Sequence, residues 1–333
     1  MSRGSARTLA ATFLVDIAWG LGSIYLTLEI YEELGLPSYF ATMGINALAG
    51  FIGMLASGIA IDLLNLRRSF ISIMILITSL SLICCALSNA DLLLMSFFLG
   101  LLLSYEPVAV AYLGEEIEQG EASGIYYTVS RMGISLGTFL GGLLLDSLEL
   151  RGLLILSSLL FLSIIPVIPD DVERFERARS SEGTPARALW FLVPIMLMES
   201  LIIPLTYSLL EIKLYDSLER SASLIGSLYS ASIMLEVAAS PLMGRLVDEL
   251  GGLRSFLCSS AIYSVSLIAC ILLHDPTSLI LIMILPTGPL YFSARNKLAV
   301  ELAGRSDVLT LSLPISISSL SDALFYVVLS IIV

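Results

Sequence analysis

Six ionisable side chains lie inside long apolar stretches of the chain, where an isolated charge is costly and commonly serves a function. They are Asp16, Glu106, Arg131, Glu199, Glu236 and Asp322. An arginine beside two carboxyl groups would hold one of them ionised and leave the other free to take up a proton. These residue types therefore predict reversible protonation or cation binding. The alternative is that they form structural ion pairs, or neutral acids that are hydrogen-bonded to the backbone.

The predicted depths of these residues differ between the two halves of the chain. Asp16, Glu106 and Arg131 fall at a similar depth, which favours a cluster of one cation and two acids. No Lys or Arg is predicted at the depth of the three acids in the C-terminal half, so we expect those acids to lack a basic partner. Glu199 lies three residues from the position that corresponds to Asp16 in the repeat described next, and this spacing keeps the same helix face.

A loop pattern occurs twice, as GIAIDLLNLRRSF at residues 58–70 and as GRLVDELGGLRSF at residues 244–256. A glycine near a helix end lets a neighbouring helix approach closely, and an aspartate can accept bonds from a facing helix N-terminus. The pattern predicts a latch that forms in one conformation and breaks in another; a plain turn with charges that fix the topology is the alternative. The residues of this latch are Gly58, Asp62, Arg67, Arg68, Gly244, Asp248 and Arg254.

The segments that carry these residues are long enough to cross a membrane as helices, which takes about 20 apolar residues. A polar stretch at residues 169–187 separates a bundle at 1–168 from a bundle at 188–333. We therefore predict an all-α membrane protein with two repeated bundles joined by a linker. The eleven expected spans are 8–31, 38–63, 69–88, 91–113, 122–147, 151–168, 188–212, 222–247, 254–273, 277–300 and 308–333.

The composition agrees with lipid as the solvent, since 57% of the residues are hydrophobic and only 14% are charged. A net charge of −12 disfavours nucleic acid as a partner, because phosphate binding needs clustered basic residues. The four cysteines have no metal-binding spacing, and the one histidine has no partners for catalysis. We therefore expect no metal, no cofactor and no enzymatic activity.

The distribution of basic residues predicts the orientation. Thirteen Lys and Arg residues, Arg295 among them, fall on the side of the N-terminus, and three fall on the other side. Loops rich in Lys and Arg face the cytoplasm, so we expect a multi-pass protein of the cell membrane with a cytoplasmic N-terminus.

The repeated loop resembles the signature of the major facilitator superfamily, in which a Gly, an Asp and basic residues lie between helices 2 and 3. Residues 107–146 also look like the helix 4 to helix 5 stretch of that family. The resemblance implies a fold of twelve helices whose helices 1, 4, 7 and 10 line a central cavity, which would include Asp16, Glu106 and Glu199. No counterpart of a twelfth helix follows residue 333, so we expect either a truncated chain or a dimer that covers that face.

These observations together predict a secondary transporter that moves a small molecule by alternating access between two halves. The acids outnumber the arginine in the predicted membrane interior, which favours proton coupling, a cationic or neutral hydrophobic substrate, and efflux. The latch would close the outward-facing state, and protonation of Glu199, with Asp16 and Glu106 as partners, would shift the equilibrium. A non-transporting scaffold and an uptake facilitator for a sugar-like metabolite are the alternatives. We expect substrate, protons and lipid as partners, and a monomer, with a dimer as the alternative.

Overall fold

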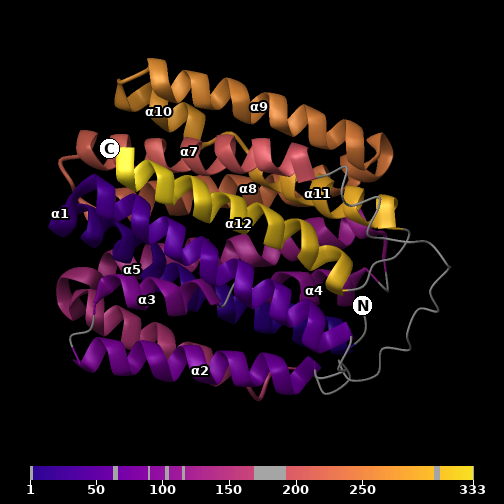
Figure 1. Ribbon diagram of the computed structural model, residues 1–333, viewed down its shortest axis with the longest axis horizontal. Helices are drawn as coiled ribbons and strands as arrows, with labels where there is room; N and C mark the ends of the chain where they lie inside the picture. The colour runs from indigo at the N-terminus through magenta and orange to yellow at the C-terminus, as the bar shows by residue number, and fades with distance from the viewer. Residues whose placement is uncertain are drawn as a thin grey trace.

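The computed structural model describes residues 3–62, 67–88, 91–101, 105–114, 117–168, 193–303 and 308–332, and it contains no strand among them. The linker predicted at 169–187 lies outside the described residues. Figure 1 shows the helices running roughly side by side, with the N-terminus and the C-terminus at opposite ends of the bundle. We call these the proximal end, which carries the N-terminus, and the distal end, which carries the C-terminus.

The first helix, α1, spans Arg3–Asp62 and is interrupted at Gly35, whose backbone has φ 80° and ψ −178°. This positive φ favours glycine, because other residues there meet their own Cβ. Sixty residues of helix would measure about 90 Å, about three times the thickness of the apolar layer of a bilayer. The break therefore divides α1 into two membrane-spanning lengths, as predicted for 8–31 and 38–63.

A second long helix is divided in the same way. Helix α5 spans Gln119–Ile164 and is interrupted at Glu149, with φ 57° and ψ 169°. The break agrees with the boundary predicted between the spans at 122–147 and 151–168. The helices that remain in the N-terminal segment are α2 (Arg67–Ser88), α3 (Leu92–Gly100) and α4 (Tyr105–Leu113).

One predicted span of the C-terminal segment consists of two helices. The stretch predicted at 277–300 forms α10 (Pro276–Met283) and α11 (Thr287–Ala303). Pro286 stands between them, and its ring nitrogen has no hydrogen to donate to the helix ladder. Near this break, the carbonyl of Met283 accepts a bond of 2.6 Å from the Ser232 hydroxyl. The other helices are α7 (Val193–Ser217), α8 (Ala222–Leu250), α9 (Gly252–Leu272) and α12 (Val308–Ile332).

The described residues contain eight helices that are long and apolar enough to cross a membrane, and two of these are α1 and α5 with their internal breaks. Large apolar side chains such as Leu80, Leu272 and Ile331 are exposed on the outside of the bundle, where lipid would cover them. The all-helical membrane fold is therefore confirmed. The count of eleven crossings and the two-fold repeat stay predictions.

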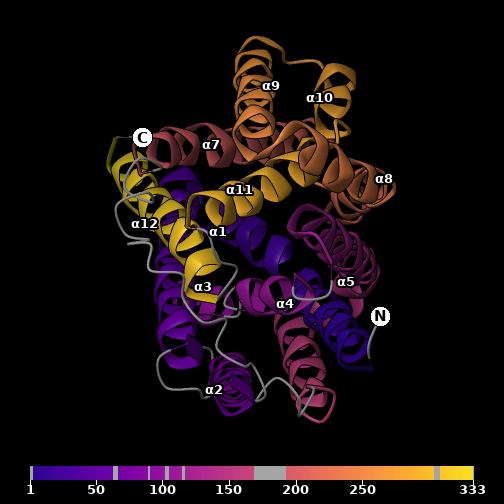
Figure 2. The same ribbon diagram turned by 90° about the vertical axis from the view of Figure 1, so that its right-hand side faces the viewer.

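Figure 2 shows how the helices are grouped when the bundle is seen from its proximal end. Helices α7 to α10 lie on one side and α2 to α5 on the other, with α1, α11 and α12 between them. Residues 3–168 and residues 193–332 thus form two groups that meet along a long interface. The division into bundles at 1–168 and 188–333 remains a prediction.

A row of glycines lets α5 lie directly against the first part of α1. A Cβ atom built on Gly133 would lie 2.6 Å from the carbonyl oxygen of Phe13, and one on Gly137 would lie 2.2 Å from that of Ile17. Only glycine allows such an approach, which agrees with the close packing expected for this row. The contact places Asp16 against the part of α5 that carries Arg131.

Candidate functional site

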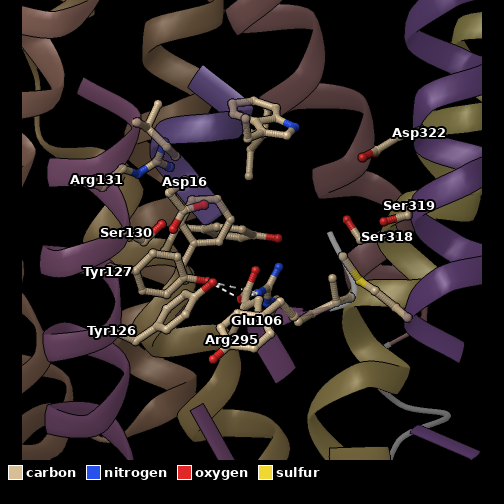
Figure 3. Close-up of a pocket in the computed structure, with 18 of the residues that line it drawn as sticks. Asp16, Glu106, Tyr126, Tyr127, Ser130, Arg131, Arg295, Ser318, Ser319 and Asp322 are labelled. Carbon is tan, nitrogen blue, oxygen red and sulfur yellow. Dashed lines mark hydrogen bonds and ion pairs between the residues drawn. The ribbon is translucent and has the colours of Figure 1, made fainter. Parts of the chain in front are cut away.

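A cavity of about 340 Å³ lies between the two groups of helices, and we call it the main cavity. Its wall combines aromatic rings with most of the membrane-embedded charges. Figure 3 shows these side chains converging on one space from α1, α4, α5, α11 and α12. The labelled polar residues are Asp16, Glu106, Tyr126, Tyr127, Ser130, Arg131, Arg295, Ser318, Ser319 and Asp322.

A buried ion pair joins α4 to α11 across the main cavity. Nη2 of Arg295 lies 2.6 Å from Oε1 of Glu106, and the Tyr127 hydroxyl donates to the same oxygen. The Arg295 side chain is only 4% exposed. Its guanidinium also lies 5.1 Å from the centre of the Phe292 ring, a distance that suits a cation–π contact. Glu106 is thus held by two donors, one from each group of helices.

The position of Arg295 corrects two expectations from the sequence. We expected Arg295 near the proximal surface and Glu106 beside Arg131. Helix α11 continues to Ala303, so Arg295 lies eight residues before its end, about 12 Å inside. Among the described residues, the membrane interior therefore contains two arginines, and Glu106 pairs with the second of them.

Arg131 has a different partner from the one expected. Its Nε lies 3.2 Å from Oε2 of Glu236, so the ion pair joins α5 to α8. The expectation that the acids of the C-terminal half lack a basic partner is therefore wrong for Glu236. The Nε–H does not point along a hydrogen bond to that oxygen, which makes the contact an ion pair without a directed bond. Like the pair at Glu106, it connects the two groups of helices.

Two acids of the main cavity keep an oxygen without a hydrogen-bond partner in the described part of the chain. These are Oδ2 of Asp16 and Oδ1 of Asp322, both of which are buried. Figure 3 shows the two carboxyl groups on opposite walls of the cavity, one on α1 and one on α12. A buried carboxyl oxygen without a donor is unfavourable, so each can be stabilised by a proton or by a bound cation.

A second cavity of about 270 Å³ lies next to the main cavity, further toward the distal end. The two cavities share four lining residues, and the second is otherwise lined by aliphatic and aromatic side chains and, in equal number, by polar ones. Two acids, Glu211 and Glu236, also contribute to its wall. The shared residues, which we call the neck, are Trp19, Arg131, Ile134 and Tyr207.

The second copy of the repeated loop contacts the other group of helices at the proximal end. Oδ1 and Oδ2 of Asp248 accept bonds from the backbone N–H groups of Gly120 and Glu121, at 3.1 and 2.9 Å. These groups lie at the N-terminus of α5, which favours a negative charge. Lys297 adds a bond of 2.8 Å to Oδ1. The contact predicted for this type of aspartate is present at Asp248, and we call it the proximal latch.

Gly244 supports the proximal latch by letting α8 and α5 touch through their backbones. A Cβ atom on Gly244 would lie 2.7 Å from the carbonyl oxygen of Gly120 and 3.2 Å from Cα of Gly124. Any larger side chain at Gly244 would push the helices apart. The glycine of the repeated loop therefore sets the distance that the Asp248 bonds require.

A second set of contacts joins the two groups at the distal end, and we call it the distal latch. Glu211 of α7 is 7% exposed and accepts bonds from the hydroxyl groups of Thr27, at 3.1 Å, and Tyr39, at 3.2 Å. One turn further on, the Tyr215 hydroxyl donates to Oε1 of Glu32 at 2.6 Å. Glu211 is not among the residues predicted from the sequence, because the segment SLLEIKLYDS looks like the polar end of a span.

The comparison with protein families gives a match to the Major Facilitator Superfamily over residues 8–212. The chain belongs to the major facilitator superfamily. Membership of this transporter superfamily, together with the fold, makes membrane transport its function and a small molecule its substrate.

Solved structures of two superfamily transporters share the fold along their whole length. The human organic anion transporter MFSD10 (TETRAN) superposes with a TM-score of 0.69 at 14% identity, covering 99% of this chain and 94% of that one. The nucleoside transporter NupG superposes with a TM-score of 0.64 at 12% identity, covering 100% and 91%. No curated protein matches the sequence.

Four residues that the sequence predicts for the proton site or for the first copy of the repeated loop have side chains outside the described part of the chain. These are Glu199, Asp62, Arg67 and Arg68. The remaining two residues of the repeated loop are described: Gly58 is buried and Arg254 is exposed. The roles predicted for all of these residues stay untested predictions.

Proposed function

We propose that the protein is a proton-coupled secondary transporter that works by alternating access and moves a cationic or neutral, largely hydrophobic molecule. The observation that carries this proposal is the arrangement of polar contacts around the two cavities. A latch closes the interface at each end, and the two ion pairs of the cavity walls also join one group of helices to the other.

The charges of the two cavities support a cation or a proton as the partner of the free acids. The walls carry five acids, namely Asp16, Glu106, Glu211, Glu236 and Asp322, against two arginines, Arg131 and Arg295. Both arginines are paired with acids. An anionic substrate would need unpaired cationic groups, whereas both arginines are paired and the main cavity keeps two carboxyl oxygens without a partner, on Asp16 and Asp322.

The two latches support alternating access. Opening the proximal end separates Asp248 from the N-terminus of α5, and opening the distal end separates Glu211 from Thr27 and Tyr39. Each latch stabilises closure at its own end, so a protein that opens at one end at a time keeps one latch formed. Asp16 and Asp322 lie on opposite walls between the latches, where a proton or a cation shared by them would draw the walls together.

The test is the movement of protons in liposomes that contain the purified protein and a pH-sensitive dye. A pH gradient is imposed, and benzyltrimethylammonium is added as a permanent cation that cannot itself carry a proton; sucrose is the neutral comparison. We expect proton movement that depends on the cation and is lost in Asp322→Asn and Asp16→Asn. Asp146→Asn is the matched control, because Asp146 is exposed at the distal rim.

The outcome separates the two parts of the proposal. Proton movement that stays the same in Asp322→Asn and in Asp16→Asn would refute the role of these two acids. Movement of radiolabelled benzyltrimethylammonium that is indifferent to the pH gradient would refute proton coupling and leave facilitated transport.

A further inference from the structure

The two cavities differ in the kind of hydrogen-bonding group that they leave without a partner. In the second cavity both acids are already engaged: Glu211 accepts bonds from Thr27 and Tyr39, and Glu236 pairs with Arg131. This wall therefore has little left with which to attract a cation.

Apart from Nε of Arg131, which is ion-paired with Glu236, two polar groups in the wall of the second cavity have no hydrogen-bond partner in the described part of the chain. They are the indole nitrogen of Trp19 and the hydroxyl of Tyr229. An indole N–H can only donate, and a phenol hydroxyl donates readily. Both groups are buried, so the absence of a partner is unfavourable. A ligand that offers an acceptor oxygen would satisfy them, and the aliphatic side chains around them, such as Leu210 and Ile233, would cover an apolar body.

The main cavity leaves the opposite kind of group unsatisfied. Apart from the nitrogens of Trp19 and Arg131 in the neck, its free atoms are the carboxyl oxygens of Asp16 and Asp322, which accept hydrogen bonds and attract positive charge. Since Trp19 lines both cavities, it is at once part of the neck and one of the two donors of the second cavity. The two spaces are therefore adjacent and chemically complementary parts of one elongated site.

We propose that this elongated site binds an amphiphilic amine in two parts. The ammonium group lies in the main cavity at Asp322 and Asp16, and an uncharged, largely apolar body with an acceptor oxygen passes the neck and lies in the second cavity against Trp19 and Tyr229. This inference names the substrate class of the proposed transporter, but it concerns binding alone and does not depend on proton coupling.

The chain contains two tryptophans, Trp19 and Trp190, so occupancy of the neck can be read directly. Trp190→Phe leaves Trp19 as the only indole, and its fluorescence is followed in detergent, without a pH gradient. The probes are lidocaine, which has a tertiary amine, an amide carbonyl and an apolar ring; 2,6-dimethylacetanilide, which is its body without the amine; and diethylamine, which is its head alone. The buffer is acidic enough to keep the amine protonated.

We expect saturable changes in Trp19 fluorescence with lidocaine and with 2,6-dimethylacetanilide, and none with diethylamine. Asp322→Asn should weaken lidocaine by about tenfold or more and leave 2,6-dimethylacetanilide unchanged, because only the amine meets the acid. Tyr229→Phe should weaken both probes by roughly two- to tenfold. Asp146→Asn and Tyr112→Phe are the matched controls, since neither residue lines either cavity.

Three results would overturn the inference. One is a Trp19 fluorescence that changes with neither lidocaine nor 2,6-dimethylacetanilide, in Trp190→Phe protein that elutes as a folded monomer or dimer. This result can be interpreted without any variant of the cavity residues. Another is an equal loss for lidocaine and for 2,6-dimethylacetanilide in Asp322→Asn, which would mean one undivided site. The last is a fluorescence change of the same size in Trp19→Phe. Only Trp190 remains in that variant, so the signal would report partitioning of the probe into detergent and not binding at the neck. Coupled proton movement without any Trp19 response would refute only this inference, and a Trp19 response without proton movement would refute only the coupling.

Discussion

Replacing Asp248 by asparagine tests the proximal latch. The side chain is 11% exposed and makes three bonds, two to backbone N–H groups at the N-terminus of α5 and one to Lys297. Asparagine has nearly the same shape, but one carboxylate oxygen becomes an NH₂ group that faces a donor. The variant should therefore fold and lose closure at the proximal end.

The size of the effect follows from the number of bonds. A hydrogen bond to a charged group contributes about 1.5–3 kcal/mol. The substitution removes one such bond, and the bonds that remain are made to a neutral amide oxygen instead of a carboxylate. We expect the state that is closed at the proximal end to lose about 2–4 kcal/mol, which is roughly a 30- to 700-fold change in the ratio of closed to open protein.

The assay is the rate at which a cysteine in each cavity is alkylated, in protein whose four native cysteines are replaced by serine. Ser318→Cys reports on the main cavity, and Ser23→Cys reports on the second cavity. In Asp248→Asn the reagent should reach the cysteine at position 318 faster. The cysteine at position 23 should react no faster. The fraction of protein that is open at the proximal end increases, and the fraction that is open at the distal end decreases.

A matched control comes from Glu301. Its carboxylate accepts bonds of 3.1 and 3.2 Å from the backbone N–H of Gly252 at the start of α9, so it resembles Asp248. That contact stays within one group of helices, and Glu301→Gln should leave both alkylation rates unchanged. The reasoning about the latch is refuted if Asp248→Asn and Glu301→Gln alter the rate at position 318 equally.

Three further predictions concern other parts of the molecule. Tyr39→Phe removes a donor from the buried carboxyl of Glu211, which should weaken closure at the distal end by about 1–3 kcal/mol and speed alkylation of Ser23→Cys without affecting Ser318→Cys. Gly137→Ala places a methyl group against the backbone of α1, 2.2 Å from a carbonyl oxygen, and should lower the thermal unfolding temperature. The Asp275 carboxyl accepts a bond from a backbone N–H at the start of α10, which lowers the pKa of that carboxyl. Its stabilising effect is therefore present at neutral pH and lost as the pH falls from about 4 through the lowered pKa, so the melting temperatures of wild type and Asp275→Ala should differ at neutral pH and converge in acid.

The sequence alone was sufficient to predict a membrane protein of helices, the breaks in α1 and α5, and the contact of Asp248. Apolar segment length predicts membrane helices without knowledge of their neighbours, and the breaks at Gly35 and Glu149 fall where polar or helix-breaking residues interrupt the apolar pattern. Asp248 could be found because a repeated Gly and Asp at a helix end is a local pattern, and its partner is the backbone of another helix rather than a particular side chain.

The partners of the buried charges could not be predicted in the same way. Arg131 was expected to pair with a nearby acid of its own half, but its partner comes from α8, more than one hundred residues away. Arg295 was assigned to the surface, and Glu211 was not singled out, because both lie close to the apparent end of a span. One signal was present: the helical pattern of SARNKLAVELA continues beyond Arg295, which places that residue well inside the helix.

The interface between α5 and α8 has a mechanical consequence. At the proximal end, Gly124 lies against Gly244; toward the distal end, a Cβ on Gly142 would lie 3.5 Å from Cα of Ser223, and one on Gly226 would lie 3.3 Å from the carbonyl oxygen of Thr138. At these glycines the two helices approach each other backbone to backbone, so no side chain of theirs has to change rotamer for the helices to part there. The time that the protein spends closed at either end is therefore set mainly by polar contacts. These are the bonds of the proximal and distal latches and the ion pair between Arg131 and Glu236.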